Sequence, residues 1–262
     1  MINFLLGLPS LDLLSVDLIS RASQIAYSLP NAKQRLLQYN GFTGDRDFLE
    51  SLATFLTKAY NDTVKVEHLC SSPGASLMLE HMLTMLTRPQ TVTRFAFFQN
   101  PTYHFVFRIF QECGFSTDQF VGIPEDCDGL DVDYLETFIK EHFEHDDGSS
   151  TRDNSHGDFY DAVLYCVPTH ANPSSSILSK ERREKLVTLA KQYNVLIICD
   201  DVYDLLTYQG VAPQRLVAYD FASKSDRPVV ISNCSFSKIL APGLRVGWVE
   251  AQEALVKRLG LR

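Results

Sequence analysis

Apolar residues recur at helical spacing in three long segments of the chain. In residues 45–60 and 74–88 they stand three and four positions apart, which places them on one helix face. Residues 179–193 show the same spacing and begin with Ser179, a residue type that caps helix N-termini, followed by Glu181 in the first turn. We therefore predict helices over these three segments.

Short apolar runs lie between the helical segments, at residues 95–98, 162–167, 195–199 and 229–232, and residues 245–249 also have the pattern of a strand. Uninterrupted apolar runs suit strands that are buried on both faces. Strand alternating with helix predicts an α/β fold, a three-layer sandwich around a mostly parallel sheet. Ligands of such sheets bind beyond the carboxyl ends of the strands, so the residues that follow each run are the candidates for chemistry.

The segment 142–159 breaks this alternation, because it is polar, charged and rich in Ser, Asp and His. We expect a surface loop there. His142 and His145 stand three positions apart and could meet a metal ion, but solvated histidines are the preferred interpretation. We predict no metal site.

Composition narrows the class of partner. The chain has 262 residues, of which 45% are hydrophobic and 21% charged, and a net charge of −8. This is a globular composition, and its acidity argues against nucleic acid or a membrane surface as a partner. The six cysteines form no C-x-x-C pair, which favours free thiols in a reducing, cytoplasmic compartment. No apolar run is long enough to cross a bilayer, and the first residues do not read as a signal peptide.

Two acids follow the run 195–199 directly. Asp200 and Asp201 stand where a strand would end, and Tyr203 comes three residues after Asp200. Asp200 could simply cap the next turn while Tyr203 packs in the core. Because adjacent strand residues point to opposite faces, only one of the two acids can face a ligand, and we assign Asp200.

Lys238 follows the run 229–232 after a short polar loop and is flanked by the apolar Phe236 and Ile239. Apolar surroundings disfavour an ammonium and would lower the pKa of this lysine, which an amine nucleophile requires to form a Schiff base. Ser235 and Arg245 are a hydroxyl donor and a bidentate cation, both suited to a phosphate. The alternative is an ordinary surface lysine.

Two turns complete the set of candidates. Gly74 opens a predicted helix, and the N–H groups of Gly74, Ala75 and Ser76 would form an anion site with the helix dipole, although any helix start looks similar. Asn172 follows the run 162–167 in an Asn-Pro turn, a sequence that is common in turns without function.

Together these segments resemble the class I/II aminotransferases, the fold-type-I enzymes that use pyridoxal 5'-phosphate (PLP). The family's lysine region, Asp-x-x-Tyr, Asn-Pro-Thr-Gly turn, Pro-Thr-Tyr segment and Gly-rich phosphate loop are similar to SFSKILAPGLRVGW, CDDVYDLL, PTHANPSS, NPTYHF and SSPGAS. They occur in the family's order and cover nearly the whole chain. Their variants look like the branch that handles 2-aminoadipate and aromatic amino acids.

The resemblance implies a role for each residue. Lys238 would bind PLP covalently and move the substrate proton, Asp200 would pair with the ring nitrogen, and Tyr203 and Asn172 would hydrogen-bond the ring's phenolic oxygen. Tyr103 would stack on the ring. The phosphate would be held by Gly74, Ala75, Ser76, Ser235, Ser237 and Arg245. Tyr39 resembles the tyrosine that reaches across a homodimer to the neighbour's phosphate.

The implied reaction transfers an amino group between an amino acid, such as 2-aminoadipate or an aromatic one, and a 2-oxo acid. A PLP lyase or decarboxylase on the same scaffold is one alternative, and a catalytically impaired fragment that only binds PLP is another. The resemblance further implies an N-terminal segment (1–40) and a PLP-binding large domain (41–262) that ends within the helix leading to a small C-terminal domain. The arginine that clamps the substrate carboxylate belongs to that absent domain, so we expect weak turnover from this chain.

Overall fold

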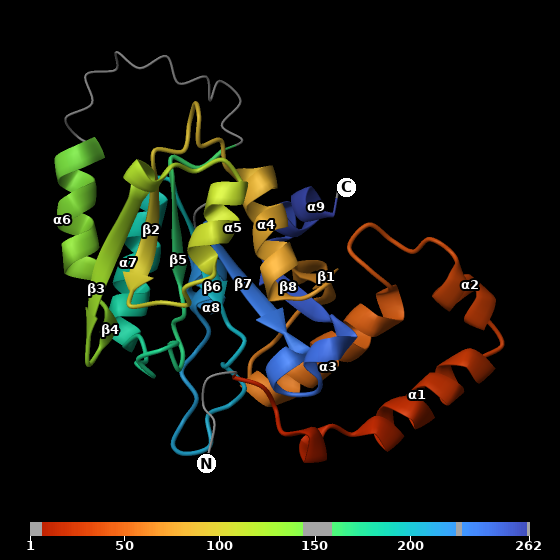
Figure 1. Cartoon of the computed structure of the whole chain (residues 1–262). Coiled ribbons are helices and arrows are strands. Elements are labelled where there is room, and N and C mark those ends of the chain that lie inside the picture. The colour runs from red at the N-terminus through yellow and green to blue at the C-terminus, as the bar shows by residue number, and fades with distance from the viewer. Residues whose placement is uncertain (1–6, 144–158, 224–226, 261–262) are drawn as a thin grey trace.

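The fold consists of three layers in the computed structural model, which describes residues 7–143, 159–223 and 227–260 (Figure 1). The middle layer is an eight-stranded sheet with the order β1-β8-β7-β6-β5-β2-β3-β4. The strands are β1 (Leu69–Ser72), β2 (Phe95–Asn100), β3 (Phe120–Asp126), β4 (Gly129–Leu130), β5 (Ala162–Cys166), β6 (Val195–Asp200), β7 (Val230–Ser235) and β8 (Gly247–Ala251). β2, β3, β5, β6 and β7 run parallel, while β8 is antiparallel to both of its neighbours. This confirms the predicted α/β sandwich.

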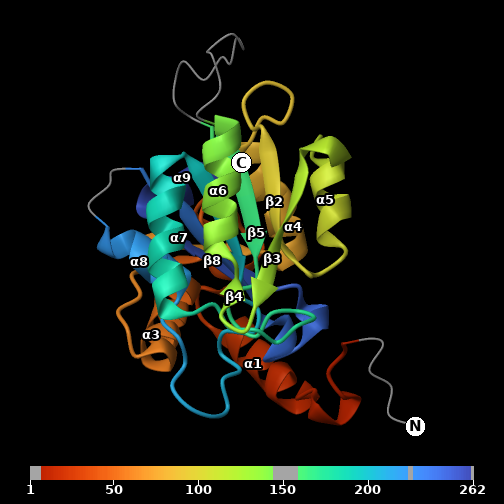
Figure 2. The same ribbon diagram turned by 90° about the vertical axis from the view of Figure 1, so that its left-hand side faces the viewer.

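Helices cover both faces of the sheet (Figure 2). One face carries α4 (Ala75–Leu86), α5 (Val106–Glu112) and α9 (Glu253–Leu259), and the other carries α6 (Val132–Phe143), α7 (Lys180–Gln192) and α8 (Leu216–Ala222). α3 (Arg46–Tyr60) packs beside β1, whereas α1 (Val16–Ser28) and α2 (Ala32–Leu37) project from the body (Figure 1). Within the described ranges, no helix combines the length and apolar character needed to span a membrane.

The three predicted helices are confirmed to within two residues at each end, and each starts directly after its N-cap residue. The Asp45 side chain accepts a hydrogen bond from Phe48 N at the start of α3, and the Ser179 side chain accepts one from Arg182 N at the start of α7. Gly74 caps α4 at φ +102°, a conformation that favours glycine.

Four of the predicted strands are confirmed as β2, β5, β6 and β7. The prediction for 245–249 was wrong at its start, because Arg245 is left-handed (φ +52°) and ends a 3₁₀ turn, so β8 begins at Gly247. The predicted loop 142–159 was also wrong at its start, since His142 belongs to α6 and its ring stacks on Phe138. Residues 144–158, with His145, lie outside the described residues.

Candidate functional site

A cavity of ≈ 640 Å³ lies beyond the carboxyl ends of β5, β6 and β7, the place that the predicted fold indicated. Ten of the eleven residues proposed to bind a cofactor line it: Ala75, Ser76, Tyr103, Asn172, Asp200, Tyr203, Ser235, Ser237, Lys238 and Arg245. The eleventh, Gly74, caps the helix that Ala75 begins. The fold therefore gathers into one cavity residues that are spread over most of the chain.

Asp200 ends β6 and is half-buried at the cavity. Its Oδ2 accepts a hydrogen bond from the Tyr165 hydroxyl at 2.5 Å, and its Oδ1 is buried with no hydrogen-bond partner among the described residues. Burial raises the pKa of the Asp200 carboxyl to about 6, although the Tyr165 hydroxyl and the nearby Lys238 charge lower it. At neutral pH the group is therefore mostly ionised, with one oxygen available to a donor.

Asp201 lies on the opposite side of the strand. It is 3% exposed, does not line this cavity and accepts a hydrogen bond from the Ser232 hydroxyl at 2.5 Å. Burial raises the pKa of the Asp201 carboxyl, and the charges of Arg183 and Arg215 oppose that rise. The two neighbouring acids thus have separate surroundings, as the alternation of strand side chains requires.

Lys238 ends the 3₁₀ turn Phe236–Lys238, and its Nζ donates to the carbonyl oxygen of Gly7 at 3.1 Å. The expected apolar setting was wrong, because the Lys238 side chain is exposed. Phe236 instead packs its ring against Trp248, with 4.8 Å between ring centroids. The turn therefore directs its apolar neighbours into the core and leaves the amine at the cavity.

Three side chains at this end of the sheet can bind an anion. Ser235 ends β7, and its hydroxyl donates to Ser237 Oγ at 2.9 Å while accepting from Ser237 N at 3.1 Å. The exposed Arg245 donates from Nη1 to the carbonyl oxygen of Pro242 at 3.1 Å, which holds its guanidinium beside the serines in the cavity lining. Hydroxyl and guanidinium donors in this arrangement suit a phosphate.

The N-terminus of α4 completes this anion site. No side chain caps its first N–H groups, because its N-cap residue is Gly74. A Cβ atom at Gly74 would lie 2.6 Å from Arg245 Nη2, so the absence of a side chain lets the guanidinium approach. Asn233 Nδ2 donates to the carbonyl oxygen of Ala75 at 2.9 Å and fixes the first turn of α4 against β7. The helix N-terminus and the cation therefore meet at one point.

Two half-buried phenols face the same cavity. Burial raises the pKa of Tyr203, the Asp200 charge raises it further, and a hydrogen bond with Asn172 opposes the rise. Burial and the Asp200 charge likewise raise the pKa of Tyr103. Both phenols stay protonated at neutral pH and can donate. Tyr39, by contrast, is 96% exposed and does not line the cavity, so its proposed role stays a prediction.

Sequence reasoning missed three features of the site. Thr102 lines the cavity with a buried Oγ1 that has no partner among the described residues, and its place beside Tyr103 was the available signal. Tyr165 contacts Asp200 from inside a uniformly apolar run, which gives no signal of a polar role. The backbone at Gly7 and the side chain of Leu8 also line the cavity.

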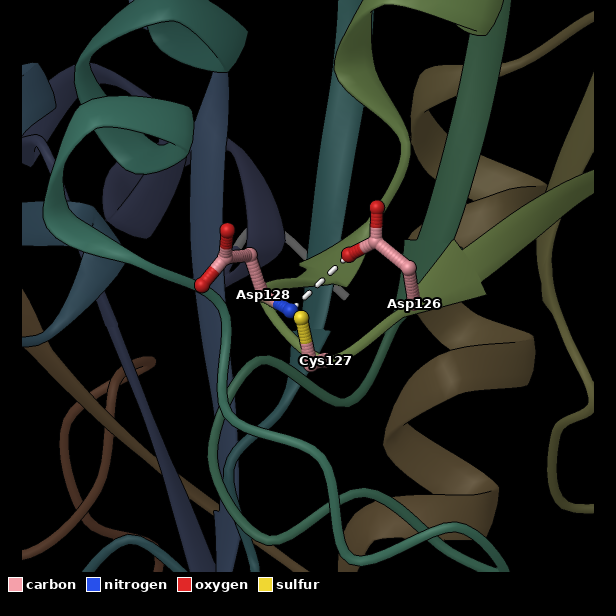
Figure 3. Close-up of side chains that lie close together, drawn as sticks. All are labelled: Asp126, Cys127 and Asp128. Atoms are coloured by element: carbon pink, nitrogen blue, oxygen red, sulfur yellow. Dashed lines mark hydrogen bonds between the residues drawn. The ribbon is translucent and has the colours of Figure 1, made fainter.

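A second group of chemically capable side chains lies elsewhere. Asp126, Cys127 and Asp128 place three potential metal ligands close together in an exposed turn (Figure 3). The Asp126 carboxylate is already bound by Arg182 through both oxygens, at 2.7 Å and 2.6 Å, and its Oδ1 also accepts from Asp128 N. This turn is therefore a structural feature, and the cavity is the better candidate.

Comparison with known proteins matches residues 8–261 to the family described as aminotransferase class I and II. The chain is 30% identical over 98% of its length to the uncharacterised protein YER152C of Saccharomyces cerevisiae, and covers 65% of that protein. It is 26% identical over 97% of its length to aromatic-amino-acid aminotransferase 1 of Thermococcus litoralis, and covers 55% of it.

Among solved structures, the kynurenine aminotransferase of Pyrococcus horikoshii, in complex with PMP, superposes with a TM-score of 0.76 at 26% identity. The match covers 97% of this chain and 57% of that one. The chain thus spans between 55% and 65% of the length of these three relatives.

Proposed function

The chain belongs to the class I and II aminotransferases, and from that premise we propose that it transfers an amino group between an amino acid and a 2-oxo acid, with PLP bound in the cavity. PLP is the cofactor of this family. The single observation that carries the proposal is the lining of the ≈ 640 Å³ cavity. An amine, a carboxylate with one unpaired oxygen and several hydrogen-bond donors suited to a phosphate converge there.

The residues present fit PLP. The buried Oδ1 of Asp200 lacks a donor among the described residues, which suits the N–H of a pyridinium ring. The hydroxyls of Ser235 and Ser237, the Arg245 guanidinium and the start of α4 suit its phosphate. When bound, PLP supplies the electron sink that stabilises negative charge at the substrate carbon.

Each side chain then has a task that its position supports. The Asp200 carboxylate would hold a proton at the ring nitrogen, and the exposed Lys238 amine would bind the cofactor and move the substrate proton. Tyr203 and Asn172 would donate to the ring oxygen, and Tyr103 would cover the ring and exclude water.

We propose an aromatic amino acid or 2-aminoadipate as the amino donor. The names of the relatives in Thermococcus litoralis and Pyrococcus horikoshii support the aromatic donor. Phe105, Val167 and Leu8 also give the cavity an apolar part that would accept a large side chain.

A homodimer in the cytoplasm is part of the proposal. No residue of α1 is buried, and the helix exposes the apolar side chains of Val16, Leu18, Ile25 and Tyr27. A second copy would cover them and bring its Tyr39 to the proposed phosphate site of this cavity.

The cysteines support the cytoplasm as the compartment. All six cysteines are free and four of them are buried, as suits a reducing compartment.

The covalent site is tested by reducing the PLP-treated chain with borohydride and mapping the labelled peptide. We expect the pyridoxyl group on Lys238 and no label in Lys238→Arg. The control is Lys257→Arg, since Lys257 is an exposed lysine paired with Glu253 on α9, and this variant should keep the label. A label on a different lysine of the unmodified chain would refute the assignment.

The reaction is tested with 2-aminoadipate, phenylalanine and kynurenine as donors. Amino transfer yields the matching 2-oxo acid and requires an amino acceptor, whereas a decarboxylase releases CO₂ without one. Release of CO₂ with no 2-oxo acid formed would replace the proposed reaction by the decarboxylase alternative.

A further inference from the structure

Tyr165 is a fully buried tyrosine of β5 that takes no part in lining the cavity. It is 1% exposed and pairs in register with Ile198 on β6. Its hydroxyl reaches the end of β6 and donates to Asp200 Oδ2 at 2.5 Å. The hydroxyl of Tyr165 thus contacts the cavity lining at the Asp200 carboxylate.

We propose that Tyr165 is a positioning residue, whose hydroxyl fixes the orientation of the Asp200 carboxylate and leaves Oδ1 open to the ligand. A carboxylate at the end of a strand can rotate, and a hydrogen bond to one oxygen selects one rotation. The bond runs to a charged acceptor in a buried setting, the kind of hydrogen bond that is strongest. The inference rests on the proposed function, which supplies the donor for Oδ1.

The charges around Asp200 show why this donor matters. Lys238, on the 3₁₀ turn, favours the ionised carboxylate, while Asp201, the next residue, disfavours it. The Asp200 charge also raises the pKa of two other phenols, Tyr103 and Tyr203, which stay neutral. Burial raises the pKa of Asp200, and the Tyr165 hydrogen bond opposes it more than any other group does. Without that hydroxyl, the ionised carboxylate loses its main support.

The first test follows the carboxyl carbon of Asp200 by NMR in the chain without PLP. Tyr165→Phe should raise the titration midpoint of Asp200 by about one to two pH units, the value of a hydrogen bond to a charged group. The matched control is Tyr160→Phe. Tyr160 is also buried, at 3% exposure, and its hydroxyl donates to the carbonyl oxygen of Pro228, so this variant loses a comparable bond without contact to Asp200.

An unchanged midpoint in Tyr165→Phe would overturn the proposal. So would an equal rise in Tyr160→Phe, since the effect would then reflect general loosening of the fold. This arm needs no cofactor, so it decides the proposal even if the chain fails to bind PLP and the proposed function is wrong.

The second test is a double-mutant cycle on PLP affinity. Tyr165→Phe should weaken PLP binding roughly tenfold, and it should have no further effect in an Asp200→Asn background, because the two residues act as one unit. Losses that add in the double variant would show that Tyr165 acts independently of Asp200 and would contradict the proposal.

A measurement on the unmodified chain covers the case in which Tyr165→Phe does not fold. The ring carbon that bears the Tyr165 hydroxyl should change its NMR shift with the same midpoint as the Asp200 carboxyl. A Tyr165 signal that stays constant while Asp200 titrates would refute the hydrogen-bonded coupling.

Discussion

The carboxyl group of Asp200 lies where burial disfavours its ionised form. Its pKa of about 6 in the folded chain lies above the ordinary value of 3.8. The folded chain therefore binds this proton more tightly than the unfolded chain does. The resulting stability is complete below pH 3.8 and is lost as the pH rises through 6. At neutral pH the cavity holds this unfavourable charge ready for a ligand.

Asp200→Asn should remove this pH dependence from the chain without PLP. We expect the free energy of unfolding of the unmodified chain, relative to the variant, to fall by about 3 kcal/mol between about pH 4 and about pH 7. Urea unfolding at several pH values measures it, and other buried acids such as Asp204 cancel in the difference. Parallel curves for the two proteins would show that Asp200 has an ordinary pKa.

Single residues also show which parts of the site could be predicted from the sequence and which could not. Most of the ten residues in the cavity follow a strand or open a helix, positions that a parallel sheet brings together, whereas Tyr103 was predicted from the family resemblance and Arg245 precedes β8. The exposure of Lys238 was not predictable, because apolar sequence neighbours say nothing about which way a 3₁₀ turn directs each side chain. Tyr165 was missed because its hydroxyl finds its partner on another strand.

At the scale of elements, the helical spacing of apolar residues made α3, α4 and α7 predictable, and the Ser179 cap added a second signal for α7. The start of β8 was not predictable. The segment from Arg245 continues the apolar pattern of a strand, but the preceding 3₁₀ turn forces a left-handed residue into it. α1 and α2 were also unforeseen, and neither helix has a buried residue within the described chain.

The turn that carries Asn172 is held by hydrogen bonds to neighbouring strands as well as by hydrogen bonds among its own residues. Here Ser174 and Ser175 replace the Thr-Gly that the family resemblance led us to expect. The Ser176 hydroxyl donates to Glu125 at 2.9 Å, and Glu125 also accepts from Gln99, whose side-chain oxygen binds the backbone N–H of Val167. This network anchors the turn to β2 and β3.

The start of α4 gives a sharp test of the anion site. Gly74→Ala should weaken PLP binding roughly tenfold, because the added Cβ atom displaces the Arg245 guanidinium. The control is Gly114→Ala, since Gly114 also has a positive φ (+94°) but open space where its Cβ would lie. Both variants should lose about 1–3 kcal/mol of stability from backbone strain. Equal PLP affinity in the two would argue against the assigned phosphate site.

At the scale of the whole molecule, the projecting helix α1 predicts association. Leu18→Lys should raise the dimer dissociation constant at least roughly tenfold, because Leu18 belongs to the apolar face that a second copy would cover. Val211→Lys, at a side chain that is 94% exposed between β6 and α8, is the control and should leave association unchanged. Sedimentation equilibrium measures both. An unmodified chain that sediments as a monomer would contradict the homodimer.

The order of the elements along the chain determines when the cavity is complete in a chain that is still being made. β1 and α4 are translated early, before residue 90, whereas Arg245 and β8 are translated only when synthesis reaches about residue 250. At about 5–20 residues per second, these events are on the order of ten seconds apart. During that interval α4 lacks the strand and the cation that complete its anion site. At the proposed site, PLP would therefore bind only after nearly all of the described chain has been translated, and it would not guide the first steps of folding.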